Sequence, residues 1–446
     1  MFESVLIANR GEVAVRVIQA CRELGATPVA VHSDTDATAK HVRLAAESHH
    51  IGGSVARNSY LDSAAILDAA RDAGVDAVHP GYGFLAESSE FAAAVEESPF
   101  VWVGPPSEIM RRFGEKTRAR SLMADAGVPV VPGTTGPVES PEAVRAFADE
   151  HGYPVAIKAD GGGGGRGMRV VREADDAEAE LEEARREAEA YFDNPAVYAE
   201  RFLDQPKHIE VQVLADKHGT VRHLGERDCS TQRRQQKLIE ETPSPVLDPD
   251  ERETLCEQAC RGVAAAGYVN AGTVEFLYQD GEHYFIEVNA RIQVEHTVSE
   301  VVTGIDLVKW QLRVAAGEAI DFTQTAVEPR GAAIEFRLNA EDPEDNFSPM
   351  PGELSTYRPP RGVGVRVDDG VDEGDAVPPF YDSMFGKVVV AGQDRTEAVR
   401  RGRRALEEAV VKGVPTTIPF HRQVLDNEAF LAAEHSTTFV EDHPEL

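Results

Sequence analysis

Residues 284–296, YFIEVNARIQVEH, alternate polar and apolar side chains. Successive side chains of a strand point to opposite faces, so an extended conformation would gather the polar groups on one face. A merely solvated face would favour Thr, Lys and Ser, whereas this one carries carboxylate, amide and guanidinium groups. We therefore predict a strand with a chemically active face. The residues of that face are Glu287, Asn289, Arg291, Gln293 and Glu295.

A second strand precedes this row in GTVEFLYQDGEHYF, and the Asp280-Gly281 pair is typical of a two-residue hairpin turn. Such a hairpin sets Glu275 almost opposite Glu287. Two carboxylates and the nearby Asn289 amide make an oxygen-rich site, of the kind that holds Mg²⁺ when phosphate oxygens complete its coordination. The residues thus predict a metal-nucleotide site.

The charge of the chain excludes some partners. Its 446 residues include 77 acidic and 45 basic ones, which gives a net charge of -32. Such a field repels nucleic acid and anionic membranes, so we expect neither as a partner. The spread of acidic residues along the chain predicts a halophile-like surface that keeps the protein soluble in high salt. Because only 9 residues are Lys, those beside motifs, Lys116, Lys158 and Lys237, stand out.

Cysteine usage and hydropathy indicate the compartment. Cys21, Cys229, Cys256 and Cys260 form no CxxC pair and no disulfide framework, which suits a reducing cytosol. No signal peptide pattern opens the sequence, and no apolar run approaches the roughly 20 residues of a membrane helix. We expect a cytoplasmic protein.

Strand and helix patterns predict a mixed α/β and α+β protein. Residues 1–113 alternate strand and helix, as in a doubly wound parallel sheet. Residues 114–330 form a second unit, within which residues 131–203 or so make a mobile lid with a glycine-rich loop. Residues 331–446 are β-rich and end in two helices.

The glycine-rich loop, residues 161–167, matches GxGxxG at Gly162, Gly164 and Gly167. A dinucleotide fingerprint must open a helix, but Met168 begins a β-prone run. We therefore interpret the loop as a hairpin whose amides fold over phosphates. A purely structural run of glycines would carry a large ordering entropy.

Other candidate residues lie near strand ends. Glu200, Arg201 and Leu203 suit an adenine or ribose edge, while His208 and Glu210 share one strand face and are either surface groups or part of the phosphate site. Tyr82 and Gly83 follow a strand end, where ligands tend to bind in such sheets, although packing is the favoured role for Tyr82.

A basic segment at residues 226–237, ERDCSTQRRQQK, stands out in this acidic chain. We read it as a turn-rich stretch in which Arg227, Arg233, Arg234 and Lys237 gather around a small anion. An ion-paired structural loop is the alternative.

Together, these motifs make the chain resemble biotin carboxylase, the ATP-grasp component of biotin-dependent carboxylases, from end to end. The segments similar to the family's, in the family's order, are ANRGEVAVRVIQACRELG, HPGYGFLAE, KADGGGGGRGMRVV, HIEVQVLAD, ERDCSTQRRQQK, IEVNARIQVEH, RLNAEDP and YDSMFGK. The resemblance implies an ATP-grasp domain at residues 114–330 between a pre-ATP-grasp domain and a biotin carboxylase C-terminal domain. The implied reaction is ATP-dependent carboxylation of biotin with bicarbonate, through carboxyphosphate.

The resemblance also implies residue roles. Glu295 would be the base that deprotonates bicarbonate, Arg337 would stabilise the enolate of biotin, and Tyr82 and Gly83 would lie near the biotin ring. Bicarbonate would bind Lys237, Arg291, Gln293 and Val294. Two Mg²⁺ ions, or Mn²⁺, would bind Glu275, Glu287 and Asn289. ATP would bind Lys116, Lys158, Gly162, Gly163, Gly164, Gly165, Met168, Glu200, Arg201, Leu203, His208, Gln232 and Gln235.

Three positions depart from the family's usual residues: Gln235 replaces His or Asn, Thr297 replaces Pro, and Thr417 replaces Asn. No biotin attachment sequence of the Met-Lys-Met type occurs. The resemblance therefore implies that biotin arrives on a separate carrier protein or domain, that a carboxyltransferase completes the reaction, and that the chain forms a homodimer.

Two rival interpretations remain. Another ATP-grasp ligase, such as a carbamoyl phosphate synthetase domain, would share the metal hairpin and lid but not the three later motifs, ERDCSTQRRQQK, NARIQVEH and RLNAEDP. A regulatory subunit without catalysis would be expected to have lost at least one of the catalytic groups, all of which are present here.

Overall fold

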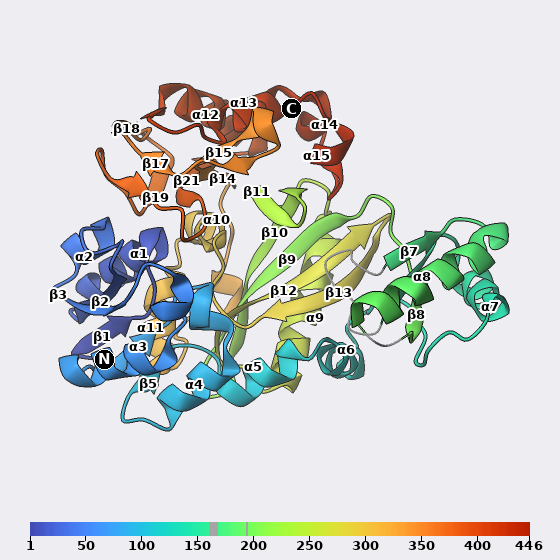
Figure 1. The fold of residues 1–446 in the computed structure, drawn as a ribbon, viewed down its shortest axis with the longest axis horizontal. Coiled ribbons are helices and arrows are strands. Elements are labelled where there is room, and N and C mark those ends of the chain that lie inside the picture. The colour runs from blue at the N-terminus through green and yellow to red at the C-terminus, as the bar shows by residue number, and fades with distance from the viewer. Residues whose placement is uncertain (160–167, 193–194) are drawn as a thin grey trace. The chain divides into compact units, whose positions relative to one another are not determined.

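The computed structural model describes residues 1–159, 168–192 and 195–446, and the chain divides into two compact units (Figure 1). The larger unit comprises Met1–Val128, His208–Phe276 and Glu287–Leu446, and the smaller comprises Pro129–Lys207 and Leu277–Ile286. The predicted phosphate loop, with Gly162, Gly163, Gly164 and Gly165, lies outside the described residues. The expected boundaries near residues 113 and 330 stay a prediction.

The larger unit begins with a five-stranded parallel sheet in the order β3-β2-β1-β4-β5, as the sequence predicted. Its strands are β1 (Ser4–Ile7), β2 (Thr27–Ser33), β3 (Glu47–Gly52), β4 (Ala77–His79) and β5 (Val101–Trp102). The helices of this region are α1 (Gly11–Glu23), α2 (Lys40–Leu44), α3 (Ser63–Ala73), α4 (Ser89–Glu96), α5 (Ser107–Gly114) and α6 (Lys116–Asp125). Alternation along β1 fills two cores, since Val5 and Ile7 pack with α1 while Leu6 packs with α3 and α4.

An eight-stranded sheet forms the rest of the framework, in the order β13-β12-β9-β10-β11-β14-β21-β19. Its strands are β9 (Lys207–Ala215), β10 (Val221–Arg233), β11 (Gln236–Thr242), β12 (Asn270–Gln279), β13 (Glu282–Asn289), β14 (Ala332–Asn339), β19 (Val365–Asp369) and β21 (Met384–Gly392). Asp280 and Gly281 join β12 to β13 with φ values of 54° and 81°. Two positive φ values are what a type I′ turn requires, so the predicted hairpin is confirmed.

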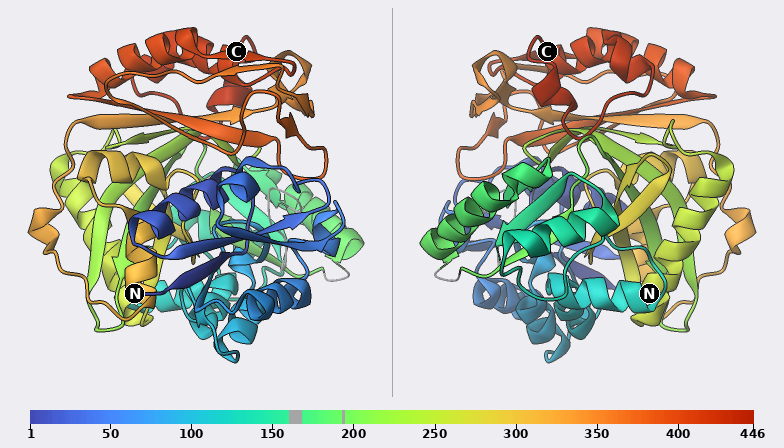
Figure 2. Two further views of the ribbon diagram at one scale, coloured as in Figure 1. Left: turned by 90° about the vertical axis from the view of Figure 1, so that its left-hand side faces the viewer. Right: turned by 90° about the vertical axis from the view of Figure 1, so that its right-hand side faces the viewer.

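Alternation along β14 decides which residues enter the site. Ile334, Phe336 and Leu338 face a core built with α12 (Arg395–Glu408) and α13 (Ile418–Asp426), which lie over this part of the sheet in Figure 2. Ala333 packs on the opposite face, against α10 (His296–Thr303). Glu335 and Arg337 therefore share the α10 side of the sheet.

The remaining elements of the larger unit complete these layers. Helix α9 (Pro249–Ala265) begins at a capping box between Asp248 and Glu251. The other elements are α11 (Leu307–Ala315), α14 (Glu428–Leu431), α15 (Phe439–Asp442), β15 (Glu341–Asp342), β16 (Ser348–Pro349), β17 (Gly352–Glu353), β18 (Thr356–Arg358), β20 (Ala376–Val377) and β22 (Val410–Lys412).

The polar row at residues 284–296 was predicted to be one continuous strand, and this prediction is wrong. Strand β13 ends at Asn289, and the amide of Arg291 donates to the Asn289 carbonyl over 2.8 Å. Helix α10 starts at His296, whose amide donates to the Gln293 carbonyl. After Asn289 the chain therefore turns and does not continue as a strand.

The prediction of a turn-rich stretch at residues 226–237 was also wrong. The segment belongs to the long strands β10 and β11, and only Arg234 and Gln235 form the turn between them, with φ values of 48° and 67°. The four cations of the segment do not gather at one place. Arg227 and Lys237 both contact Glu210, whereas Arg233 contacts Asn346 and Arg234 lies in the turn.

The smaller unit is a three-stranded antiparallel sheet in the order β7-β6-β8 with two helices. Its elements are β6 (Val155–Ala159), β7 (Met168–Val171), β8 (Val197–Arg201), α7 (Pro141–His151) and α8 (Ala177–Phe192). Helix α8 is more than the solvated surface expected, because Leu181, Ala184 and Ala188 are buried in the core of this unit.

All four cysteines are free thiols, and Cys21, Cys229 and Cys256 are buried. Within the part of the chain that the structure describes, no helix combines the length and the apolar character that a membrane span requires.

Candidate active site

The site of the larger unit is centred on the buried ammonium of Lys237, at the start of β11. Its Nζ atom donates to Glu210 Oε2 over 2.6 Å, to Glu295 Oε1 over 2.6 Å and to Glu275 Oε1 over 3.0 Å. These carboxylates come from β9, the turn before α10, and β12. The ammonium thus links three segments that are far apart in sequence.

Arg227, on β10, forms a second buried cation directly opposite Glu210 on β9. It donates to Glu210 over 2.5 Å and to Gln293 over 2.9 Å. Further donations reach Gln212, Thr273 and Ser299, and the side chain is fully buried. Since these protein groups occupy its donors, Arg227 does not serve as the anion ligand that the sequence suggested.

Arg337, on β14, is linked to Lys237 by Glu295, whose carboxylate contacts both cations. Arg337 Nη2 donates to Glu295 Oε2 over 3.0 Å, and its Nε atom donates to Glu240 Oε1 over 2.6 Å. The Glu295 carboxylate therefore lies between one ammonium and one guanidinium. This arrangement can hold a small planar anion next to a carboxylate.

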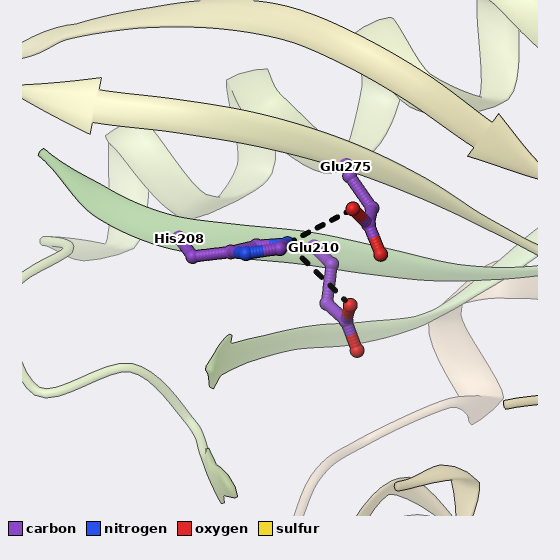
Figure 3. Close-up of side chains that lie close together, drawn as sticks. All are labelled: His208, Glu210 and Glu275. Atoms are coloured by element: carbon purple, nitrogen blue, oxygen red, sulfur yellow. Dashed lines mark ion pairs between the residues drawn. The ribbon is translucent and has the colours of Figure 1, made fainter. Parts of the chain in front are cut away.

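The carboxylate of Glu275 gathers several of the predicted residues. Its Oε1 atom accepts hydrogen bonds from Asn289 Nδ2 at 2.8 Å and from Gln293 Nε2 at 2.9 Å, in addition to Lys237. His208 Nε2 lies 3.1 Å from Glu275 Oε2 (Figure 3). Burial opposes charge on His208, but Glu275 prevails and raises the pKa of the imidazole.

Two clusters near Glu210 have metal-ligating atoms close together, namely His208 with Glu210 and Glu275, and Glu210 with Cys229 and Glu295. Figure 3 shows the first cluster, in which His208 points toward both carboxylates. Lys237 contacts Glu210, Glu275 and Glu295, so its ammonium already supplies the positive charge in both clusters. We do not assign a metal to either cluster.

Glu275, Glu287 and Asn289 offer the oxygen donors that Mg²⁺ prefers. Burial, followed by the nearby Glu275 charge, raises the pKa of Glu287. Its nearest cation among the described residues is Lys116, whose Nζ atom is 3.8 Å from Glu287 Oε2. A divalent cation would stabilise the charged form of Glu287 beside the charged Glu275, so these residues fit the metal.

Arg291 lies in the turn after β13 and is largely buried. Its guanidinium contacts Glu87 and donates to Asn289 Oδ1 over 3.1 Å. Although residues 290–295 are not a strand, Asn289, Gln293 and Glu295 still meet at the site, through hydrogen bonds to Glu275 and Lys237. Arg291 is held at the edge of the site.

The charge states of the buried acids divide into two groups. Burial alone would raise the pKa of Glu295, but Lys237, then Arg337 and Arg227, outweigh it and hold that pKa well below its usual range. Lys237 and His208 do the same for Glu275. In contrast, burial raises the pKa of Glu240 to about 7 and of Glu335 to about 8.

Glu240 and Glu335 are directly opposite each other on β11 and β14. Besides burial, the charge of Glu240 raises the pKa of Glu335, and the charge of Glu295 raises the pKa of Glu240. Each has one oxygen without a hydrogen-bond partner among the described residues. The site therefore contains two carboxylates whose pKa values are lowered beside two acids whose pKa values are raised.

The predicted nucleotide residues lie in both units. In the larger unit, Gln232 is buried on β10, whereas Gln235 is exposed in the turn. In the smaller unit, Lys158 Nζ donates to Glu200 Oε2 over 2.6 Å, and Met168 is the register partner of Lys158. Arg201 donates to Glu282 over 2.7 Å, and Leu203 is buried.

The two Thr departures make specific contacts. The Thr297 hydroxyl donates to Glu335, which a proline could not do. The Thr417 hydroxyl donates to the Arg337 carbonyl over 2.7 Å and accepts from the Asn339 amide over 3.1 Å. Thr417 therefore supports the strand that carries Arg337.

Sequence reasoning missed several residues of this region. Glu240, Glu335, Lys387 and Glu12 are buried, and each contacts a predicted site residue or another member of this set. Glu335 and Lys387 stand alone inside the apolar runs AAIEF and MFGKVVVAG, which is the signal that could have found them.

Comparison with known proteins identifies this arrangement. A model of the biotin carboxylase N-terminal domain matches residues 1–110, and one of the biotin carboxylase C-terminal domain matches residues 335–442. Between them, a model of the ATP-binding domain of the carbamoyl-phosphate synthase L chain matches residues 115–323. The central domain is thus of a type shared with the rival ligase. The flanking domains match biotin carboxylase and distinguish this chain from that ligase.

Relatives cover nearly the whole chain. It is 50% identical to a pyruvate carboxylase subunit of Methanothermobacter thermautotrophicus, over 99% of this chain and 90% of that protein. It is 49% identical to biotin carboxylase 1 of Bacillus subtilis, over 99% of each.

Solved structures agree. The biotin carboxylase domain of a thermophilic 2-oxoglutarate carboxylase, bound to bicarbonate, has a TM-score of 0.95 at 42% identity and covers 100% of this chain and 99% of that one. A dimer of this domain from Hydrogenobacter thermophilus, in complex with MgADP, ADP and bicarbonate, has a TM-score of 0.90 at 44% identity. The match covers 100% of this chain and 98% of that one. Fold and site define an ATP-grasp ligase. The chain belongs to the biotin carboxylase family.

The raised pKa of Glu335 predicts a pH-dependent stability. Relative to its ordinary value of 4.5, a pKa of about 8 means that the folded state retains a proton that the unfolded chain releases. This stabilisation is full below about pH 4.5 and is lost as the pH rises toward 8. Between about pH 5 and pH 8, the wild type should therefore lose stability relative to Glu335→Gln, which mimics the neutral acid.

Urea unfolding midpoints, followed by circular dichroism at several pH values, measure this difference. Glu318→Gln, at an exposed position, is the matched control and should follow the wild type. If the curves of Glu335→Gln and the wild type ran parallel across this range, Glu335 would be ionised throughout it.

Proposed function

We propose that this chain carboxylates the biotin of a carrier protein, with ATP and bicarbonate as co-substrates, in the first half-reaction of a biotin-dependent carboxylase. The observation that carries the proposal is the position of Glu295, with Lys237 2.6 Å from one carboxylate oxygen and Arg337 3.0 Å from the other. A base thus lies between two cations that suit an anionic substrate and an anionic intermediate.

The first step joins bicarbonate to the γ-phosphate. Glu295 takes the proton of bicarbonate, and the resulting carbonate oxygen attacks the γ-phosphorus of ATP. The bond from that phosphorus to the bridging oxygen breaks, ADP leaves, and carboxyphosphate forms. Lys237, Arg291, Gln293 and the Val294 backbone would position the bicarbonate.

The low pKa of Glu295 fits this role only if it changes on binding. Bicarbonate would take over the hydrogen bonds that Lys237 and Arg337 give to Glu295. Once the carboxylate loses these partners, burial dominates and raises its pKa. The proton affinity of the base thus rises when its substrate is bound, as general base catalysis requires.

The second step transfers the carboxyl group. The C–O bond to phosphate breaks and releases CO₂ and phosphate, and the phosphate takes the ureido proton of biotin. The ring nitrogen then attacks CO₂, while Arg337 stabilises the enolate oxygen. Tyr82 and Gly83 would lie near the ring.

Glu275, Glu287 and Asn289 would hold Mg²⁺, which supplies charge neutralisation at the phosphate groups. Lys116, His208, Gln232 and Gln235 would contact ATP from the larger unit. From the smaller unit, the contacts would come from Lys158, Met168, Glu200, Arg201 and Leu203. A closed lid would limit the loss of carboxyphosphate to water.

We further propose that the chain works with a biotin carrier and a carboxyltransferase, as a cytoplasmic homodimer. The relative whose name describes it as part of a pyruvate carboxylase, together with the dimeric solved structure, supports this assembly. The acidic composition supports solubility in high salt, which is tested by comparing activity at low and high salt.

The reaction itself is tested by ADP release from MgATP, with and without bicarbonate and free biotin. We expect bicarbonate-dependent turnover that biotin stimulates. Nucleotide binding without such turnover at any salt concentration would instead favour a regulatory subunit.

Glu295→Gln should lower bicarbonate-dependent ADP release by about 10²-fold or more, the usual contribution of a general base. Because Gln keeps the volume of the side chain, MgATP affinity, measured by calorimetry, should stay within about twofold. The exposed Glu318→Gln is again the control. An active Glu295→Gln enzyme would remove Glu295 from the role of base.

Lys237→Gln should lower kcat/KM for bicarbonate by roughly 100-fold, because a buried cation that faces the anion is lost. The change also leaves three carboxylates without their shared partner, so the melting temperature is measured in parallel. Lys217→Gln, at an exposed position, controls for the loss of a lysine. Unaltered turnover would make Lys237 purely structural.

A further inference from the structure

Lys387 is a buried ammonium with no part in the proposed chemistry. It lies on β21, directly opposite Arg337 on β14, and its side chain is fully buried. Burial alone would lower the pKa of its ammonium, but Glu12, Glu335 and Asp368 outweigh burial and raise it, so the group is charged. Such a charge is retained only where its partners are well placed.

One partner of Lys387 is the backbone carbonyl of Val294, to which Nζ donates. Val294 stands between Gln293, which contacts Arg227 and Glu275, and Glu295, which contacts Lys237 and Arg337. The Val294 carbonyl and the Glu295 amide belong to one planar peptide group. Anchoring the carbonyl therefore fixes the peptide from which the Glu295 side chain extends.

The other partner is Glu12, whose Oε1 atom is 3.3 Å from Lys387 Nζ. The Tyr82 hydroxyl donates to the same Glu12 oxygen, and Lys387 Nζ lies 5.9 Å from the centre of the Tyr82 ring. Tyr82 and Val294 are thus both tied to Lys387, Tyr82 through Glu12 and Val294 by a direct hydrogen bond.

Glu12 is itself held in place by the fold. It lies in the first turn of α1, and the backbone of that turn packs closely against Gly370. A Cβ atom at Gly370 would be 2.6 Å from the Glu12 amide nitrogen. The carboxylate between Tyr82 and Lys387 is therefore attached to a fixed backbone.

We propose that Lys387 is a positioning residue that couples the biotin side of the site to the bicarbonate side. Through Val294 it orients the turn that carries Glu295, and through Glu12 it orients Tyr82. This inference rests on the proposed function. It requires that a change at Tyr82 alter the use of bicarbonate even when no biotin is present.

The first test uses Tyr82→Phe, which removes only the hydroxyl. With free biotin absent, we expect a severalfold rise in KM for bicarbonate in the basal bicarbonate-dependent ADP release, while KM for ATP stays within about twofold. A bicarbonate KM equal to that of the wild type would overturn the proposal, because Tyr82 would then act on biotin alone.

The second test uses Lys387→Met, which keeps the length of the side chain without its charge. Loss of a charged hydrogen bond predicts a fall of roughly 10- to 100-fold in kcat/KM for bicarbonate. We also expect stimulation by free biotin to fall toward onefold. Retained wild-type values for both would overturn the coupling. The double variant Tyr82→Phe/Lys387→Met should have the same kcat/KM for bicarbonate as Lys387→Met alone, because both changes break the same chain of contacts.

Lys40→Met is the matched control, since Lys40 is a partly buried lysine that contacts Asp369, Asp372 and the Val371 carbonyl. It should retain wild-type bicarbonate kinetics. If Lys387→Met does not fold, as judged by circular dichroism, Tyr82→Phe decides the question. Absence of bicarbonate-dependent turnover in the wild type would refute the proposed function, which separates that failure from a failure of the coupling.

Discussion

The contact of one ammonium with three buried carboxylates is the interaction on which the site depends. Lys237 draws Glu210, Glu275 and Glu295 from three segments to within hydrogen-bond distance. Unpaired, each carboxylate would bear a large desolvation cost, so the ammonium stabilises this arrangement of the segments. A substrate anion that enters must exchange partners with groups that are already paired. Binding and activation of the base are therefore one electrostatic event.

Much of the fold follows from local patterns in the sequence. Strand and helix periodicity predicted the parallel sheet, and the Asp280-Gly281 pair predicted the hairpin, because both signals are local. The extension of β13 to His296 failed because alternation continues through the turn, where hydrogen bonds to Asn289 and Gln293 replace the strand. Periodicity does not distinguish a strand from a turn that happens to preserve it.

The candidate site was predicted where residues share one motif, and missed where strand pairing brings them together. Glu275, Asn289, Gln293, Glu295 and Lys237 do meet, as their motifs suggested. Glu240 and Glu335 become neighbours only through the register of β11 against β14, which the sequence of either strand does not contain. From the sequence, Arg227 looked like an anion ligand. Its burial was missed because it depends on acceptors from four other segments. Long-range register and burial are thus the missing information.

The close packing of Gly370 against the start of α1 has a consequence for biosynthesis. Residues far apart in the sequence must meet before Glu12 faces Lys387. On the ribosome, α1 emerges long before β21, because about 360 residues separate them in the sequence. Until that strand docks, the turn that carries Glu295 lacks its anchor. The turn and Tyr82 are therefore tied together only after β21 has been synthesised and has paired with β14.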